Sequence, residues 1–194
     1  MIRQGFLFIA DKIRASKLFE TVIDIAELYD TAQGSYPVQY IGQGNYKPIN
    51  ISENNGLAYL RKLSPMRFGK SPIESREVCD SQYEQAIIPI RILISIRKEK
   101  LGIDNAFASD YLAEEFFRIL QGRSGELANS SEAIDAEILI NEINDDRLHI
   151  LSEEFAGAGR DIPYDYLLMT IDLDLVLQFN RACMAKFCEG YDYE

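Results

Sequence analysis

The chain has 194 residues, with 31 acidic and 20 basic side chains and one histidine, so its formal charge is −11. That length is enough to bury a substantial core, and it predicts one domain or at most two small ones. So acidic a chain is not expected to bind nucleic acid or an anionic membrane through its overall electrostatic field. The single histidine, His149, excludes metal sites that need two imidazole ligands.

The N-terminal segment has neither the long apolar region nor the small-residue cleavage site of a signal peptide. The longest apolar stretches of the whole chain, such as 86–90 and 173–177, are far below the roughly 20 residues that a membrane-spanning helix requires. Cys79, Cys183 and Cys188 are odd in number and contain no CxxC pair. We therefore expect reduced cysteines in a cytoplasmic protein.

The first predicted element is a helix over 11–31. Asp11 can cap it, and Gly34 ends it. Apolar residues recur inside it at three- and four-residue steps, as one face of a helix requires: Ala15, Leu18, Val22, Ile25, Ala26 and Tyr29.

Residues 37–51 favour extended chain, which Gly42 and Gly44 divide into a hairpin or loop. Residues 52–85 are the least regular part of the sequence, because Asn-Gly and Ser-Pro pairs interrupt them. We expect a long loop or an excursion from the sheet here, in which 57–63 form a strand or one helical turn. Long loops in compact domains are often functional.

The strongest strand signal lies at 86–97. Isoleucine occupies every second position from 88 to 96, and mostly polar residues stand between. This period of two predicts one buried face and one mostly polar face. Pro89 lacks an N–H, so it is expected at a sheet edge or near the start of the strand.

Further elements are predicted in the second half of the chain from periodicity and turn residues. They are a helix over 105–120, a flexible loop over 121–134, strands at 137–143 and 148–151 around the turn Asn144-Asp145-Asp146-Arg147, and a strand at 166–179.

Together these elements predict an α+β fold: a single domain over 1–194, with a mostly antiparallel sheet and two helices packed on one face. The expected core combines the stripes of both helices with the apolar faces of the two long strands: Ile88, Ile90, Ile92, Ile94, Ile171, Leu173 and Leu175.

Charge is unevenly distributed along the chain. Residues 1–102 carry 14 basic and 11 acidic side chains, a balance of +3, whereas 103–194 carry 6 and 20, a balance of −14. The basic group in the irregular region is better explained as a flexible charged loop that meets an acidic surface than as a nucleic-acid patch. The candidate interaction surface therefore has two parts: Arg61, Lys62, Arg67, Lys70 and Arg76, and the acidic pair Asp172 and Asp174.

Three patterns have both a chemical and a structural interpretation. His149 lies near Asp145 and its neighbours in the sequence, and the group is interpreted either as a metal site or as part of a solvated turn. Asp172 and Asp174 are expected roughly 7 Å apart on one face of a strand. They are interpreted either as an acid–base pair or as part of the solvent-facing side of an amphipathic strand. Residues 42–47 are glycine-rich but match no phosphate-binding motif. The structural interpretation is preferred each time, so no catalytic, cofactor-binding or metal-binding residue is predicted.

The order of elements is helix, extended segments with a long loop, long strand, helix and closing strands. This order resembles the tail terminator and tail-completion proteins of phages, and the matching pieces are 11–31, 36–51, 87–98 followed by 105–120, and 137–179. In that family the subunits form a ring at the head-proximal end of the tail tube. The resemblance implies a homo-oligomer or binding to other tail proteins, through two different complementary surfaces. It also implies a location in a virion or phage-like particle as the alternative to the cytoplasm.

The function predicted from the sequence is therefore that of a non-enzymatic, ring-forming assembly protein of a phage-like tail. One alternative is a small cytoplasmic enzyme or ligand-binding domain, which would gather Asp172, Asp174, His149 or tyrosines in an acidic pocket. A second alternative is a protein–protein adaptor unrelated to phages.

Overall fold

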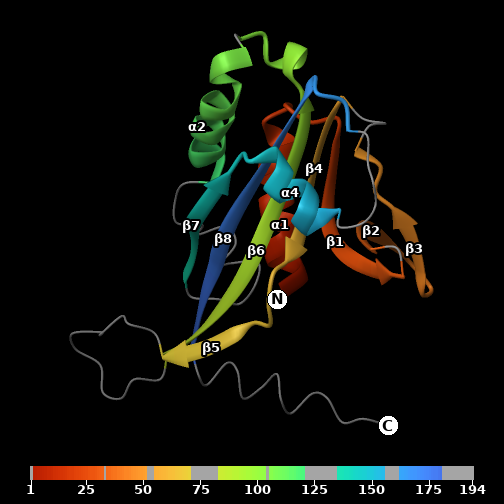
Figure 1. Cartoon of the computed structure of the whole chain (residues 1–194). Coiled ribbons are helices and arrows are strands. Elements are labelled where there is room, and N and C mark those ends of the chain that lie inside the picture. Colours follow the sequence, from red (N-terminus) through yellow and green to blue (C-terminus); the bar gives the residue numbers. More distant parts are fainter. Residues whose placement is uncertain are drawn as a thin grey trace.

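The computed structural model describes residues 2–32, 34–51, 55–70, 83–103, 105–120, 135–155 and 162–180. Three helices and eight strands lie within these ranges (Figure 1). In chain order they are α1 (Ile2–Ala15), β1 (Thr21–Thr31), β2 (Gly34–Gly42), β3 (Asn45–Pro48), β4 (Gly56–Lys62), β5 (Arg67–Lys70), β6 (Tyr83–Arg97), α2 (Ala108–Leu120), β7 (Asp135–Asn144), α4 (Arg147–Glu154) and β8 (Tyr166–Asn180). Short 3₁₀ turns occupy Lys98–Leu101 and Asn105–Phe107.

The strands form one eight-stranded sheet in the order β3-β2-β1-β4-β6-β8-β7, with β5 paired to β6 beyond the end of β4. β1 and β4 run parallel, and all the other pairs are antiparallel. The two long central strands, β6 and β8, pair along all 15 residues. The predicted α+β fold with a mostly antiparallel sheet is confirmed.

Apolar residues cover both faces of this sheet. One buried cluster combines residues of α1 and α2 with alternate residues of β6 and β8, and it includes every residue of the predicted strand core: Ile88, Ile90, Ile92, Ile94, Ile171, Leu173 and Leu175. A second cluster joins α4 to the opposite faces of β4, β6 and β8 through Tyr59, Leu93, Ile150 and Phe155. Figure 1 shows α4 in front of the sheet and α1 behind it.

The prediction of a mostly polar second face on the 86–97 strand was wrong. Pro89, Leu93 and Ser95 are all buried there, because α4 and its neighbours pack on that side. Nor does Pro89 lie at an edge, since β6 is central. Its carbonyl accepts from the Leu63 N–H at 3.0 Å, so its missing N–H faces the gap where β4 ends and β5 begins.

The predicted helix over 11–31 was wrong in both its start and its end. The helix occupies Ile2–Ala15, Lys17 takes a left-handed conformation (φ 60°), and Thr21–Thr31 is a strand. Ile23 and Ala26 are three positions apart in the sequence, and a bulge between them puts both buried side chains on the same face of the strand. That spacing imitates a helical period, whereas the β-branched residues of this segment favour a strand.

The segment expected as a loop excursion contains a central strand. Residues 57–60 of β4 are all buried between β1 and β6, so they show a continuous apolar run and no alternation. This answers the open choice at 57–63 in favour of a strand. Residues 71–82 and the predicted loop at 121–134 lie outside the described residues.

The predicted strand at 148–151 was also wrong. Asp146 accepts hydrogen bonds from the backbone N–H groups of Leu148 (2.9 Å) and His149 (3.2 Å). These bonds cap the first turn of α4, so the Asp-rich segment begins a helix and does not form a hairpin turn. The predicted helix at 105–120 and the strands at 137–143 and 166–179 are confirmed as α2, β7 and β8.

Gly5 of α1 packs against β8 without room for a side chain, because a Cβ there would collide with Cδ2 of the fully buried Leu175. We expect Gly5→Ala to lower the free energy of unfolding by about 1–3 kcal/mol, through overpacking, although alanine is the better helix former by roughly 1 kcal/mol. Urea unfolding measures the change. In a Leu175→Ala background the cost should vanish, and an equal cost in both backgrounds would contradict the contact.

Candidate functional site

A row of charged side chains crosses the sheet on the α4 side. Strand register places Arg61 of β4 opposite Arg91 of β6, and Arg91 opposite Asp172 of β8. The last turn of α4 brings Glu153 and Glu154 over this row. We call these residues, together with Tyr59, the ion network.

Glu154 is the centre of the ion network, and its side chain is completely buried. The Tyr59 hydroxyl donates to its Oε2 at 2.9 Å. Arg61 donates from Nε at 2.9 and 3.0 Å and from Nη2 at 2.5 Å, and Arg91 Nη1 donates to Oε1 at 3.1 Å. Arg91 also holds Asp172 in a bidentate pair at 2.7 and 2.8 Å and reaches Glu153 at 2.5 Å.

These contacts shift the pKa values of two members of the ion network, Tyr59 and Arg91. Burial raises the pKa of Tyr59 well above its usual value, and the Glu154 carboxylate adds to the shift. Hydrogen bonds, that to Asp172 foremost, raise the pKa of Arg91 further above its already high value. Tyr59 thus stays neutral and Arg91 stays charged. With its donors and acceptors paired to one another, the network is suited to holding α4 on the sheet rather than to transferring protons.

Two of the predicted basic residues form ion pairs within the chain, one of them with a predicted acidic residue. Arg61 pairs with Glu154, and Arg67 Nη2 lies 3.7 Å from Asp174 Oδ1. The side chains of Asp172 and Asp174 are 18% and 19% exposed, so the expectation of a solvent-facing acidic pair was wrong. Lys62 is exposed. The Lys70 side chain and Arg76 lie outside the described part of the molecule.

The other sequence patterns occupy ordinary structural positions. His149 is half-exposed on α4, with Nε2 3.4 Å from Glu153 Oε1. Gly42 and Gly44 have positive φ angles of 98° and 76° in the β2–β3 hairpin, which explains the glycines at 42–47 by a turn. In the ranges that the structure describes, no group of three or more His, Cys, Asp or Glu side chains could hold a metal ion.

An exposed cluster of tyrosines was not predicted. On β1–β3, the side chains of Tyr29, Tyr36, Tyr40 and Tyr46 form what we call the tyrosine face. Ring centroids are 5.8 Å apart for Tyr29–Tyr36, 6.5 Å for Tyr29–Tyr46 and 5.3 Å for Tyr40–Tyr46. Tyr29, Tyr40 and Tyr46 remain 43–50% exposed. The even spacing of Tyr36 and Tyr40 was the available signal, but the clustering depends on the strand pairing of Tyr29 with Tyr36 and of Tyr40 with Tyr46.

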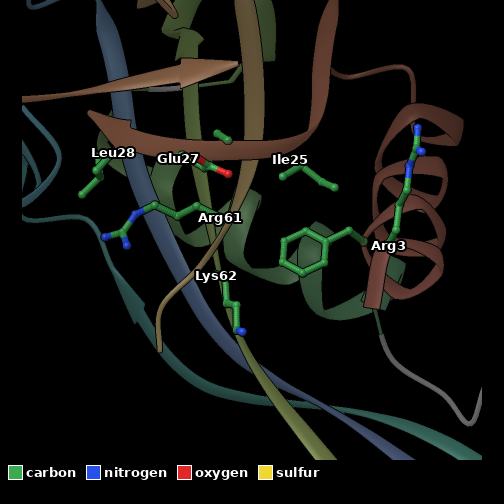
Figure 2. Close-up of a pocket in the computed structure, with 8 residues that line it drawn as sticks. Arg3, Ile25, Glu27, Leu28, Arg61 and Lys62 are labelled. Carbon is green, nitrogen blue, oxygen red and sulfur yellow. The ribbon is translucent and has the colours of Figure 1, made fainter. Parts of the chain in front are cut away.

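A cavity of about 470 Å³ lies beside the tyrosine face, where the parallel pairing of β1 with β4 ends (Figure 2). We call it the β1 cavity. Its lining comes from α1, β1 and the end of β4: Arg3, Phe6, Ile25, Ala26, Glu27, Leu28, Arg61 and Lys62. A second hollow of about 760 Å³ shares Arg3, Ile25 and Glu27 with it and reaches Tyr40. The β1 cavity and the tyrosine face thus adjoin.

Comparison of the sequence with protein-family models and with curated proteins gives no match. Among the described helices, none is long and apolar enough to cross a membrane. The functional conclusions below therefore depend on the geometry of this chain.

Replacing Glu154 by glutamine should be strongly destabilising, because it leaves Arg61 and Arg91 as adjacent, mostly buried cations. We expect Glu154→Gln to reduce the free energy of unfolding by about 3–5 kcal/mol. The matched variant Glu153→Gln alters a partly exposed carboxylate and should cost less than about 1 kcal/mol. Equal costs for the two variants in urea unfolding would show that Glu154 is not the centre of the network.

Tyr59 should make the protein sensitive to alkali. Because its pKa is raised in the folded state, the folded protein retains the phenolic proton above pH 10 while the unfolded chain loses it. The free energy of unfolding is therefore expected to fall as pH rises beyond about 10, the ordinary tyrosine value. Tyr59→Phe should flatten this pH dependence while costing about 1–3 kcal/mol at neutral pH. An unchanged slope between pH 9 and 11.5 would contradict the assignment.

Proposed function

We propose that this protein is a non-enzymatic assembly protein of a phage-like tail, acting as a tail terminator or completion subunit that associates with further copies of itself. The single observation that carries the assembly role is the tyrosine face. Tyrosine is enriched at protein interfaces because it offers a large rigid contact area together with a hydroxyl. A cluster of this kind, left 43–50% exposed at three of its four members, supports a docking surface.

The area of the tyrosine face indicates how much of an interface it can supply. A buried aromatic side chain contributes about 150–250 Å², so the three half-exposed tyrosines offer roughly 200–400 Å², with a smaller addition from the more buried Tyr36. A standard interface buries about 800 Å² on each partner. The tyrosine face therefore needs adjoining surface, and the β1 cavity beside it is the natural extension.

The state of the acidic residues favours assembly over the enzyme alternative. That alternative required an acidic pocket that gathers Asp172, Asp174, His149 or tyrosines, and of these, among the described residues, only Tyr40 lines one of the two hollows. Asp172 is bound by Arg91, Asp174 lies beside Arg67, and His149 lies on the outer side of α4 next to Glu153. None of these three residues lines the β1 cavity or the hollow beside it.

The tail assignment rests on the order of elements. The second helix after a long strand and the closing strands are the parts that support it: α2 follows β6 after two short 3₁₀ turns, and β7 and β8 come last in the chain order, with α4 between them. The first matching piece, 11–31, departs from the pattern, because the helix is α1 (Ile2–Ala15) and Thr21–Thr31 is a strand. We further propose that the chain is a single domain in which α1 and α2 cover one face. The shared buried cluster of Phe6, Ile9, Leu112 and Phe116 with β6 and β8 supports that arrangement.

Self-association tests this function. Sedimentation velocity of the whole chain over a concentration series at low salt should show oligomers, and the double variant Tyr40→Ser, Tyr46→Ser should shift the midpoint to at least about tenfold higher concentration. Tyr164→Ser is the control, because Tyr164 is 85% exposed but lies outside the tyrosine face.

Two outcomes would contradict this function. A wild-type chain that remains monomeric both alone and with purified tail-tube subunits would exclude the tail role. Equal weakening by the Tyr40/Tyr46 double variant and by Tyr164→Ser would show that the tyrosine face is not the docking surface. Capsid, portal or tube genes beside this gene would support the tail role, whereas metabolic neighbours would count against it.

A further inference from the structure

We propose that Leu148 of one copy inserts into the β1 cavity of the next copy, with Asp145 and Asp146 facing Arg3 and Lys62. This inference rests on the proposed function and names the two surfaces that meet. It assigns the receiving surface to the first half of the chain and the inserted surface to the second half.

The receiving side is an apolar hollow flanked by cations. Phe6, Ile25 and Leu28 supply its apolar walls, and Figure 2 shows Arg3 and Lys62 on different sides of it. Within the described residues, neither Arg3 nor Lys62 has an ion-pair partner. The cavity is therefore suited to an apolar side chain that has carboxylates next to it.

The inserted side is the beginning of α4. Leu148 is 78% exposed, although the other apolar residues of this helix pack on the sheet. Asp145 and Asp146 directly precede α4 and are exposed, and within the described ranges neither has an ion-pair partner, although Asp146 also caps the helix. The neighbouring Arg147 does not offset them at this surface, because its guanidinium donates to the carbonyls of Tyr166, Ile162 and Pro163.

Other exposed apolar residues fit the cavity less well. Tyr164 has an acidic neighbour, but the Arg147 guanidinium lies 5.0 Å from its ring centroid and occupies that face. Leu139 is 42% exposed on the edge strand β7, so it projects less than Leu148. Phe107 is 64% exposed in a 3₁₀ turn whose sequence, Asn-Ala-Phe, contains no acidic residue.

The charges around the cavity and those beside Leu148 have opposite signs once the residues that form ion pairs within their own chain are left out of the count. Arg61 lines the cavity, but Glu154 holds its guanidinium. Glu27 also lines the cavity and offsets one of the two cations, which leaves a balance of +1 against the two aspartates. This replaces the charge match expected from the sequence, because Arg61, Arg67, Asp172 and Asp174 are engaged within their own chain.

The wall of the cavity that α1 supplies lies on the side of the sheet opposite α4, although Ala26 and Arg61 of the lining belong to the α4 side, and Leu148 does not line the cavity. The cavity includes residues of α1, whereas Leu148 begins α4, and these helices lie behind and in front of the sheet in Figure 1. One copy therefore cannot fill its own cavity. The contact is heterologous, and it produces a ring where the rotation closes and a filament where it does not.

A charge exchange tests the contact in the full-length chain. Leu148→Ser and Lys62→Glu should each weaken self-association about tenfold or more in sedimentation velocity at low salt. Combining Lys62→Glu with Asp145→Lys should restore much of the association. Phe107→Ser is the control and should leave association unchanged. Circular dichroism and urea unfolding confirm that each variant is folded.

Mixing two variants tests the head-to-tail geometry. Leu148→Ser retains an intact cavity, and the double variant Arg3→Glu, Lys62→Glu retains an intact Leu148. Each should remain monomeric alone, and an equimolar mixture should form dimers and nothing larger. If association is lost in the Tyr40/Tyr46 variant but not in Leu148→Ser or Lys62→Glu, the function stands and this inference is wrong. A wild type that never associates overturns both.

Discussion

Glu154 is the group on which the arrangement of this protein most depends. The strand register places the guanidinium groups of Arg61 and Arg91 side by side under α4, and two neighbouring cations in a mostly buried site are unfavourable without a shared anion. The fully buried Glu154 carboxylate meets both, and Arg91 extends the pairing to Asp172. The end of α4 is thereby tied to β4, β6 and β8, and the second buried cluster forms beneath it.

This network changes the meaning of the charge asymmetry between the two halves of the chain. Three basic residues of the first half meet acidic residues of the second half inside one molecule, as Arg61–Glu154, Arg67–Asp174 and Arg91–Asp172. Part of the asymmetry is thus used within the fold. The other charges around the β1 cavity and at the start of α4 have no such partner in the described residues, and with the tyrosine face they are the surface proposed for contact.

The elements that could be predicted from the sequence have a period that burial does not distort. The isoleucines of β6, the apolar stripe of α2 and the leucines of β8 each show the period of their element, and all three were correctly located. β1 was missed because its bulge spaces Ile23 and Ala26 like helical neighbours. β4 was left open between a strand and a helical turn because burial on both faces removes alternation, and α4 was missed because its capping aspartate also suits a turn.

By itself, the sequence determined the fold class, the two central strands, the second helix and the strand core, because side-chain periodicity is a local property. The tertiary structure decided which charges are paired and which surfaces remain for contact. Arg61 and Glu154 are 93 residues apart, and their meeting depends on the register of three strands and the docking of a helix. The tyrosine face likewise exists only because β2 pairs with both β1 and β3. Contacts between distant segments are set by strand pairing, which no local pattern specifies.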